Sequence, residues 1–351
     1  MEGSRPATVR FDHGSGELVL VDQTLLPGEV RSIHLTEPDQ VREAIYNLRV
    51  RGAPAIGVAA AYGVYLGACR SPAEDGSGIS RDFRAACELI VASRPTAVNL
   101  AWAVRRMASV FAASERLPRL ALLAALRKEA DAILEEDVEV CRRIGENGLA
   151  LLRPGWGLLT HCNAGALATA GDGTATAPIY LGTRKGYRFR VFADETRPLL
   201  QGARLTAWEL HEAGVDVTVI CDNMASLVMG RGWVQAALVG CDRVAANGDA
   251  ANKIGTSGLA VIAKHHGVPL YVHAPLSSID LACASGKDIP IEERAPEEIA
   301  EMWYVRRMTP RGVKAFNPAF DVTDHSLITA IVTEKGVVRP PYEKSIPALF
   351  R

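Results

Sequence analysis

The stretch that decides the fold runs Thr160-His161-Cys162-Asn163-Ala164-Gly165-Ala166-Leu167-Ala168-Thr169-Ala170-Gly171. It follows the apolar run Trp156-Gly157-Leu158-Leu159, which predicts a short buried strand. Small residues let backbone amides approach a ligand closely, and several N–H groups that point one way form an anion site. A cysteine that ends a strand and opens such a loop is a candidate reactive group. This stretch alone is equally compatible with a tightly packed turn around a buried, inert thiol.

Composition sets limits on the class of protein. The 351 residues suffice for two domains, and 48% hydrophobic with 23% charged residues is an ordinary globular balance. A formal net charge of −1 provides no general attraction for nucleic acid or for an anionic membrane. The seven cysteines are scattered without a CxxC pair, which indicates neither a disulfide framework nor a zinc site.

Targeting signals are also not evident in the sequence. Residues 1–5 contain no apolar signal core, and no apolar stretch is long enough to cross a bilayer. We therefore expect a soluble, cytoplasmic protein with no membrane partner.

The first part of the chain is predicted to be mostly helical. Two β-like runs, Glu17–Gln23 and Val30–Leu35, predict a small hairpin, and Thr36-Glu37-Pro38 is typical of a helix start. Helical periodicity then covers residues 39–49, 55–69, 81–93, 97–113 and 120–152, with a polar loop at 71–78. These patterns predict an N-terminal helical domain over residues 1–150.

After Pro154-Gly155 the pattern changes to alternating strands and helices. Strands are predicted at 156–161, 190–193, 216–221, 235–241 and 268–273, with helices at 200–213, 224–230 and 254–266. This alternation predicts an α/β domain at residues 151–351, Rossmann-like, with helices on a parallel sheet. No Gly-x-Gly-x-x-Gly fingerprint follows its first strand, so we do not expect a dinucleotide.

Polar residues gather where the predicted strands end. In an open parallel sheet, ligands bind beyond the carboxyl ends of the strands. Four successive strand ends carry an acid or a thiol: His161-Cys162-Asn163, Asp194-Glu195-Thr196-Arg197-Pro198, Cys221-Asp222-Asn223, and Gly240-Cys241-Asp242-Arg243. We do not expect His161 to pair with the Cys162 thiol, because neighbours on a strand point to opposite faces.

Asp242 is a candidate acid, since it follows the apolar run 236–240. A carboxylate there is either a turn cap or an acid whose pKa burial raises. Asn252 and Lys253 are predicted at the start of the following helix, where amide N–H groups and a cation suit a phosphate. The alternative for these two is an ordinary capped helix with a solvated lysine.

Two arginines of the helical domain could bind an anion. Pro54 suits the first position of a helix, which places Arg51-Gly52-Ala53 just ahead of its positive end. Arginine can clamp a phosphate through two parallel hydrogen bonds. Arg94 stands between two predicted helices and equally fits a role in answering the dipole of the helix that ends there.

Four motifs together resemble the methylthioribose-1-phosphate isomerase family, which also includes the regulatory subunits of the initiation-factor exchange complex and ribose-1,5-bisphosphate isomerases. The resemblance extends over nearly the whole chain. Its motifs are residues 51–57 (Arg-Gly-Ala-Pro-Ala-Ile-Gly), 160–169, 194–206 and 242–249 (Asp-Arg-Val-Ala-Ala-Asn-Gly-Asp).

The resemblance implies an isomerase of methionine salvage that converts 5-methylthioribose 1-phosphate to 5-methylthioribulose 1-phosphate. It implies a homodimer with Cys162 and Asp242 as the catalytic pair. The implied substrate contacts are Arg51, Gly52, Ala53, Arg94, Gln201, Asn252 and Lys253. The chain departs from the family pattern at Asp172, Pro178, Cys241 and Asp324, and the first two lie close to the thiol loop, where they bear on the choice of sugar.

An aldose 1-phosphate imposes a particular chemistry. Its anomeric oxygen is esterified, so an acid must protonate the ring oxygen before the ring can open. We assign this role to Asp242, which burial would keep protonated near neutral pH. Cys162 then acts as the base of an enediol route, or stabilises charge in a hydride shift from C2 to C1. Neither route requires a Lewis acid, so we expect no metal and no cofactor.

Two other functions remain open. One is a non-catalytic regulatory subunit of the same fold, which would have no chemical reason to keep both Cys162 and Asp242. The other keeps the chemistry and changes the sugar to 5-deoxyribose 1-phosphate or ribose 1,5-bisphosphate, the latter requiring extra cationic groups.

Overall fold

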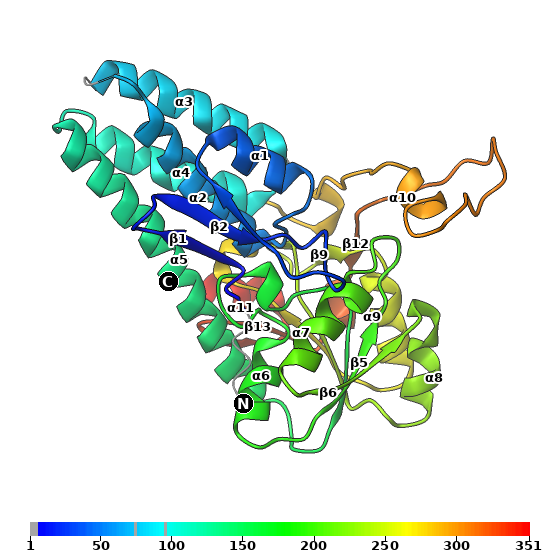
Figure 1. Ribbon diagram of the computed structural model, residues 1–351. Helices are drawn as coiled ribbons and strands as arrows, with labels where there is room; N and C mark the ends of the chain where they lie inside the picture. The colour runs from blue at the N-terminus through cyan, green and yellow to red at the C-terminus, as the bar shows by residue number, and fades with distance from the viewer. Residues whose placement is uncertain (1–5, 74–75, 95–96) are drawn as a thin grey trace. The chain divides into compact units, whose positions relative to one another are not determined.

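The computed structural model describes residues 6–73, 76–94 and 97–351 (Figure 1). Pro95, Thr96 and part of the predicted loop 71–78 lie outside the described residues. The chain forms two compact units: Met1–Arg143 with Gly165–Thr174, and Ile144–Ala164 with Ala175–Arg351.

The first division falls inside the long helix α5 (Arg119–Leu149), slightly ahead of the boundary expected at residue 150. The return of Gly165–Thr174 to the first unit was not expected. Side chains of that unit hold it: Thr8 Oγ1 donates to Ala166 O at 2.7 Å, and Gln23 Nε2 donates to Leu167 O at 2.7 Å. Such contacts join residues too far apart in sequence for periodicity to reveal them.

The first unit combines a helical bundle with the predicted hairpin, which an unpredicted strand extends to a three-stranded antiparallel sheet. The sheet has the order β1 (Val9–Asp12), β2 (Glu17–Val21), β3 (Ser32–Leu35). The helices are α1 (Pro38–Tyr46), α2 (Ala53–Arg70), α3 (Gly76–Ser93), α4 (Val98–Ser114) and α5. Helix α2 is buried along most of its length, because its many Ala and Gly residues let neighbouring helices approach closely.

The second unit is built on a sheet of order β14-β13-β10-β7-β4-β5-β6. Its strands are β4 (Gly157–Thr160), β5 (Arg190–Asp194), β6 (Asp216–Ile220), β7 (Ala236–Val239), β10 (Leu270–His273), β13 (Ala330–Thr333) and β14 (Gly336–Val338). All adjacent pairs are parallel except β13 with β14. The predicted parallel, Rossmann-like sheet is therefore confirmed.

This strand order places a ligand crevice. The first strand of the unit, β4, is central: β5 and β6 follow on one side, and β7, β10 and β13 on the other. The chain thus reverses its direction of winding between β4 and β7. In open α/β sheets, ligands bind outside the carboxyl ends of the strands at this switch point.

A second sheet brings residues that closely follow β7 together with residues near position 320. It has the order β11 (Ile279–Asp280), β8 (Arg243–Ala245), β9 (Ala250–Lys253), β12 (Phe320–Thr323). Asn252 and Lys253 therefore lie on a strand, and the prediction that they start helix α9 (Thr256–His265) is wrong. Strand β9 forms because it pairs antiparallel with both β8 and β12.

Short helices connect these strands. They are α6 (Ala177–Arg184), the π-turn η2 (Gly202–Thr206), α7 (Ala207–Glu212), α8 (Ala225–Gly230), α9, α10 (Glu297–Ala300) and α11 (Tyr342–Ala348). None of the helices searched, all within the described ranges, is long and apolar enough to cross a membrane.

Candidate active site

The proposed catalytic residues leave neighbouring strands. In the β4–β7 pair, Thr160 lies opposite Leu238. Cys162 follows two residues after Thr160, and Asp242 follows just after the end of β7 at Val239. Both side chains therefore emerge at the same edge of the sheet, on the two strands that flank the switch point.

The backbone of Cys162 is held in an unusual conformation. Its φ is +65°, in the left-handed region that non-glycine residues rarely adopt. Two hydroxyls fix it: Thr196 Oγ1 accepts from the Cys162 amide at 2.8 Å, and Thr206 Oγ1 donates to the Cys162 carbonyl at 2.6 Å. Strained residues held by their surroundings are concentrated at functional sites.

The residue that supports Cys162 is itself held tightly. Thr196 has φ +67°, and its Oγ1 also donates to the carbonyl of Asp194 at 2.9 Å. The Asp222 carboxylate accepts from the amides of Thr196 and Arg197, each at 2.7 Å. The ends of β4, β5 and β6 are thus joined by hydrogen bonds behind the thiol.

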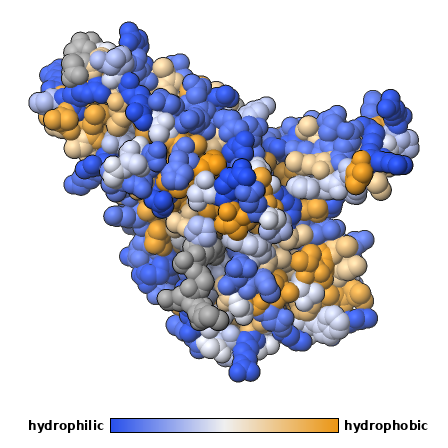
Figure 2. Space-filling model, viewed as in Figure 1, coloured by the Kyte–Doolittle hydropathy of each residue, from blue (hydrophilic) through white to orange (hydrophobic). Residues whose placement is uncertain are grey.

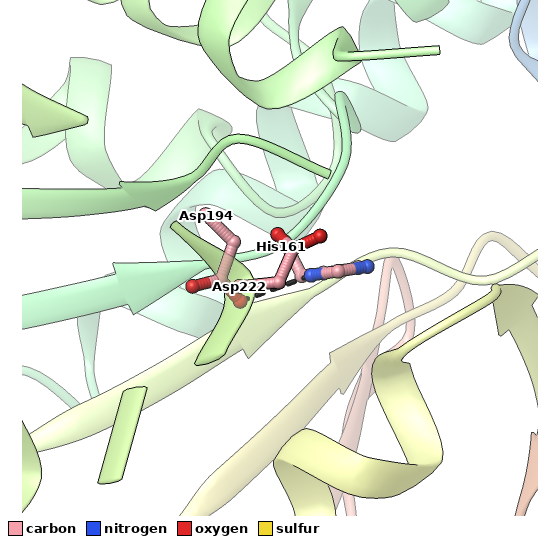
Figure 3. A group of neighbouring side chains, drawn as sticks. All are labelled: His161, Asp194 and Asp222. Carbon is pink, nitrogen blue, oxygen red and sulfur yellow. Dashed lines mark hydrogen bonds and ion pairs between the residues drawn. The ribbon is translucent and has the colours of Figure 1, made fainter. Parts of the chain in front are cut away.

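Both ring nitrogens of His161 contact groups other than the Cys162 thiol. Its Nδ1 lies 2.9 Å from Asp194 Oδ2 (Figure 3). Its Nε2 lies 2.9 Å from the carbonyl of Ile254. Both nitrogens are thus engaged, in agreement with the expectation that His161 does not pair with Cys162. Asp222 lies beside this pair in Figure 3.

Burial and the contact between His161 and Asp194 shift the pKa of each of these residues in opposite directions. Burial disfavours the imidazolium, but the hydrogen bond and charge of Asp194, with Asp222, outweigh it and raise the pKa of His161. Burial also raises the pKa of Asp194, and the hydrogen bond to His161 offsets only part of this. Both directions favour retention of a proton shared between the two side chains.

Asp242 is partly buried, and its amide donates to the carbonyl of Ala251 at 2.9 Å. The neighbouring Cys241 is one of the positions at which the chain departs from the family pattern. Burial, and next the charge of Asp242, raise the pKa of the Cys241 thiol. Cys241 is therefore an un-ionised neighbour of the candidate acid.

Gln201 offers a polar atom for a ligand. Its side chain is 5% exposed, and its Oε1 has no hydrogen-bond partner within the described chain. An unsatisfied buried polar atom costs about 1–3 kcal/mol. Gln201 precedes the π-turn η2, where Gly202 is required because a Cβ would lie 1.7 Å from the Asp194 carbonyl. Such π-turns recur at functional sites.

Asn252 and Lys253 are buried at the end of β9. Asn252 Nδ2 donates to Thr256 Oγ1 at 2.9 Å. Lys253 Nζ donates to the Ala319 carbonyl at 2.8 Å and lies 4.6 Å from the centre of the Phe320 ring. Lys253 is therefore not the solvated lysine of the alternative interpretation.

The start of α9 is already occupied by an anion. The Asp321 carboxylate accepts from the amides of Gly255 at 2.8 Å and Ser257 at 3.1 Å. The prediction that the amides at the start of this helix bind a phosphate is therefore wrong. The aspartate comes from β12, far along the chain, and nothing in the local sequence indicated it.

The remaining predicted contacts belong to the first unit. Gly52 has φ +90°, and a Cβ on it would lie 2.5 Å from Ala168 Cα, so this position requires glycine. It precedes α2, whose first residue is Ala53. Arg51 is partly buried beside it, and Arg94 follows the last residue of α3.

Metal-binding side chains gather at two places among the described residues: His161, Asp194 and Asp222, and Asp249, Asp324 and His325. In the first group, both His161 nitrogens and both Asp222 oxygens already have hydrogen-bond partners. Asp194 Oδ1 lacks a hydrogen-bond partner among the described residues, but one oxygen does not make a set of metal ligands. The expectation of a metal-free site stays a prediction.

The sequence places His161, Asp194, Thr196 and Asp222 at strand ends, but it does not predict that they hold the thiol in place. It also does not predict Thr206 as a support of Cys162. Thr206 lies 44 positions from Cys162 in the chain. Its place at the end of the 194–206 motif was the signal in the sequence that could have pointed to it.

Comparisons with known proteins agree with this architecture. The chain matches the model described as "Initiation factor 2 subunit family" over residues 49–340. It is 62% identical to a methylthioribose-1-phosphate isomerase of Symbiobacterium thermophilum, over 98% of this chain and 96% of that protein. It is 55% identical to a 5-deoxyribose 1-phosphate isomerase of Petrotoga mobilis, over 97% of this chain and 98% of that one.

Among solved structures, the 5-methylthioribose 1-phosphate isomerase of Pyrococcus horikoshii OT3 is similar along the whole chain. The TM-score is 0.93 at 44% identity, and the match covers 99% of this chain and 96% of that one.

Proposed function

Because the chain belongs to the initiation factor 2 subunit family, among its methylthioribose-1-phosphate isomerases, we propose that it converts 5-methylthioribose 1-phosphate to 5-methylthioribulose 1-phosphate. The observation that supports this proposal is that Cys162 and Asp242 follow the carboxyl ends of β4 and β7, the two strands at the switch point. The family resemblance and the isomerase class predicted from sequence are thus confirmed. This activity belongs to methionine salvage.

In the proposed mechanism, Asp242 gives a proton to the ring oxygen, and the bond from that oxygen to C1 breaks. The hydrogen of C2 then becomes a hydrogen of C1, and the C2 hydroxyl becomes the ketone as it gives its proton to the Asp242 carboxylate, which restores the acid. In an enediol route, Cys162 takes the C2 hydrogen as a proton. In a hydride shift, the hydrogen moves with its electron pair and Cys162 stabilises the charge.

Substrate binding is assigned to the predicted contacts. In the second unit, Lys253 supplies a cation, while Gln201 supplies a buried oxygen that lacks a partner within the described chain and can accept from a sugar hydroxyl. Asn252 adds an amide on the same strand as Lys253. For the first unit, Arg51, Gly52, Ala53 and Arg94 remain predicted contacts from the family resemblance.

A turnover assay tests the proposal. We would compare 5-methylthioribose 1-phosphate, 5-deoxyribose 1-phosphate and ribose 1,5-bisphosphate with the parent protein. The methylthio sugar should have the highest kcat/KM. A preference for 5-deoxyribose 1-phosphate would instead favour the activity named for the Petrotoga mobilis relative, and no turnover of any sugar would favour a regulatory subunit.

Isotope exchange separates the two routes. With turnover in D2O, deuterium at C1 of the product supports an enediol with Cys162 as base. Product without deuterium counts against a free enediol.

We also propose that the protein is a homodimer. Residues 301–318, which we call the arm, project from the second unit after α10 (Figure 1), and Figure 2 shows hydrophobic side chains on it. Exposed large apolar side chains of the arm are Met302, Tyr304, Val305, Met308, Val313 and Phe316. A second exposed group is Val219, Met224 and Leu227, near α8. Exposed apolar side chains that gather on one segment are typical of interaction sites.

Analytical ultracentrifugation would give the mass of two chains for a dimer. Replacement of Val305 and Met308 by Asp should shift it toward one chain if the arm is part of the interface. A single-chain mass for the parent at all concentrations would rule out the dimer.

We propose that the protein is cytoplasmic. None of its seven cysteines forms a disulfide within the described chain, which is typical of proteins in a reducing compartment.

A further inference from the structure

The imidazole of His161 connects segments that carry two different parts of the proposed site. Nδ1 contacts Asp194 at the end of β5, and Nε2 contacts Ile254 between β9 and α9, each at 2.9 Å. His161 directly precedes Cys162, and Ile254 directly follows Lys253. One ring therefore joins the thiol to the strand of the proposed substrate-binding residues.

The chemistry of the partners fixes where the protons lie. A backbone carbonyl only accepts, so His161 Nε2 carries the hydrogen that is donated to Ile254. A single proton is then shared in the contact between Nδ1 and Asp194. The other carboxyl groups that act on this pair are Glu195, Asp222 and Asp321. His161 is only 1% exposed, so water does not compete for either contact.

Packing makes the link stiff. Gly255 has φ +103°, and a Cβ there would lie 2.9 Å from His161 Cε1. The ring thus rests on the backbone at the start of α9. A shift of the ring would move the end of β9, and a shift of the end of β9 would move the ring.

We infer that His161 is a positioning residue that couples the placement of Cys162 to that of Asn252 and Lys253. It acts through its two hydrogen bonds and touches no reacting atom. This inference rests on the proposed function, because the roles of these three residues do.

Two amide replacements separate the contacts. The side-chain nitrogen of Asn overlays Nδ1 of histidine, and that of Gln overlays Nε2. His161→Asn can therefore keep the bond to Asp194 and lose the bond to Ile254. His161→Gln can keep the bond to Ile254 and lose the bond to Asp194.

The two variants should affect different kinetic parameters. In His161→Asn the strand end with Lys253 loosens, so we expect KM for 5-methylthioribose 1-phosphate to rise about tenfold, with kcat within about threefold. In His161→Gln the thiol loses its support from β5, so we expect kcat to fall about tenfold, with KM within about threefold. His325→Asn alters the contact with Asp249, which lies at 2.8 Å outside the site, and should leave both parameters unchanged.

The inference is overturned if both folded His161 variants keep the parent kcat and KM. It is also overturned if both variants show the same fall in kcat together with the same rise in KM, since that pattern indicates a merely structural role. If the parent itself shows no turnover, the proposed function fails.

A measurement on the parent protein needs neither activity nor a folded variant. Histidine ¹⁵N spectra should show the hydrogen fixed on His161 Nε2 throughout the range from about pH 5 to 9, whereas a free neutral imidazole exchanges its hydrogen between the two nitrogens. An Nε2 that loses its proton in this range would overturn the inference.

Discussion

Two clusters of one histidine and two aspartates illustrate how context decides what the same residue types do. In the first, His161 Nδ1 lies 2.9 Å from Asp194, and in the second, His325 Nδ1 lies 2.8 Å from Asp249. The His161 side chain is 1% exposed and that of His325 is 35% exposed. The contacts are almost equal in length, but water reaches only one of them.

The two clusters also differ in what they connect. The first joins the carboxyl ends of parallel strands and adjoins Cys162, whose backbone is strained. In the second, Asp249 accepts from the amides of His325 and Gly286 and so closes loops beside the smaller sheet. A His–Asp pair indicates a functional site only when it lies at a strand end that carries reactive groups.

The largest effect is expected at the thiol and the acid beside the first cluster. Cys162→Ser and Asp242→Asn should each lower kcat by about a thousandfold, because each removes a group that acts on the reacting bonds. Steady-state turnover of 5-methylthioribose 1-phosphate measures this. Cys283→Ser, at a buried thiol outside the site, is the matched control. Parent-like kcat in either site variant would refute the assignment.

A third histidine, His273, sharpens the comparison because it has no carboxylate partner. It is 0% exposed, neither ring nitrogen has a well-formed hydrogen bond in the described chain, and burial lowers its pKa to about 4. The unfolded chain binds a proton near pH 6.5 and the folded chain does not, so acid favours unfolding.

The free energy of unfolding should therefore fall by about 3 kcal/mol as the pH falls from about 6.5 to 4. His273→Leu should reduce this loss, whereas His265→Leu, at an exposed ring, should not. Urea titrations at each pH give the values. An equal loss in His273→Leu would show that other groups cause the acid sensitivity.

A smaller effect is expected from the hydroxyl that donates to the Cys162 carbonyl. Thr206→Val keeps the side-chain shape and removes this bond, so we expect kcat to fall about tenfold as the strained backbone relaxes. Thr218→Val, at an exposed position on β6, is the control. Equal kcat in the two variants would show that Thr206 does not hold the thiol in its working position.

The smallest effect is expected in the second cluster. Asp249 raises the pKa of His325, so their pairing stabilises the fold below about pH 6.5 and is lost as the pH rises through the folded pKa. Because water reaches this pair, His325→Leu, which removes the contact with Asp249, should cost no more than about 1 kcal/mol in the free energy of unfolding at pH 6. Thermal unfolding measures it, and a larger loss would erase the distinction between the clusters.

The sequence predicted the fold well where structure is local. The apolar runs that form β4 to β7 and β10 were recognisable, and parallel strands share one edge, so Cys162 and Asp242 could be placed together. Long-range pairing was not predictable in this way. Lys253 became part of a strand because β9 pairs with residues near position 320.

The supports of the site depend on similarly distant contacts. Asp321 occupies the start of α9, and the hydroxyls of Thr196 and Thr206 reach Cys162 across 34 and 44 positions of sequence. Each of these residue types is common in loops and caps. Only the three-dimensional arrangement separates these side chains from ordinary loop residues.

A crystal structure of Cys162→Ser with 5-methylthioribose 1-phosphate bound would test the central claim most directly. The account predicts that C1 and C2 of the sugar lie beside the residue 162 side chain, with the ring oxygen within hydrogen-bond distance of the Asp242 carboxyl. A sugar bound away from the carboxyl ends of β4 and β7, or with its ring oxygen turned from Asp242, would contradict it.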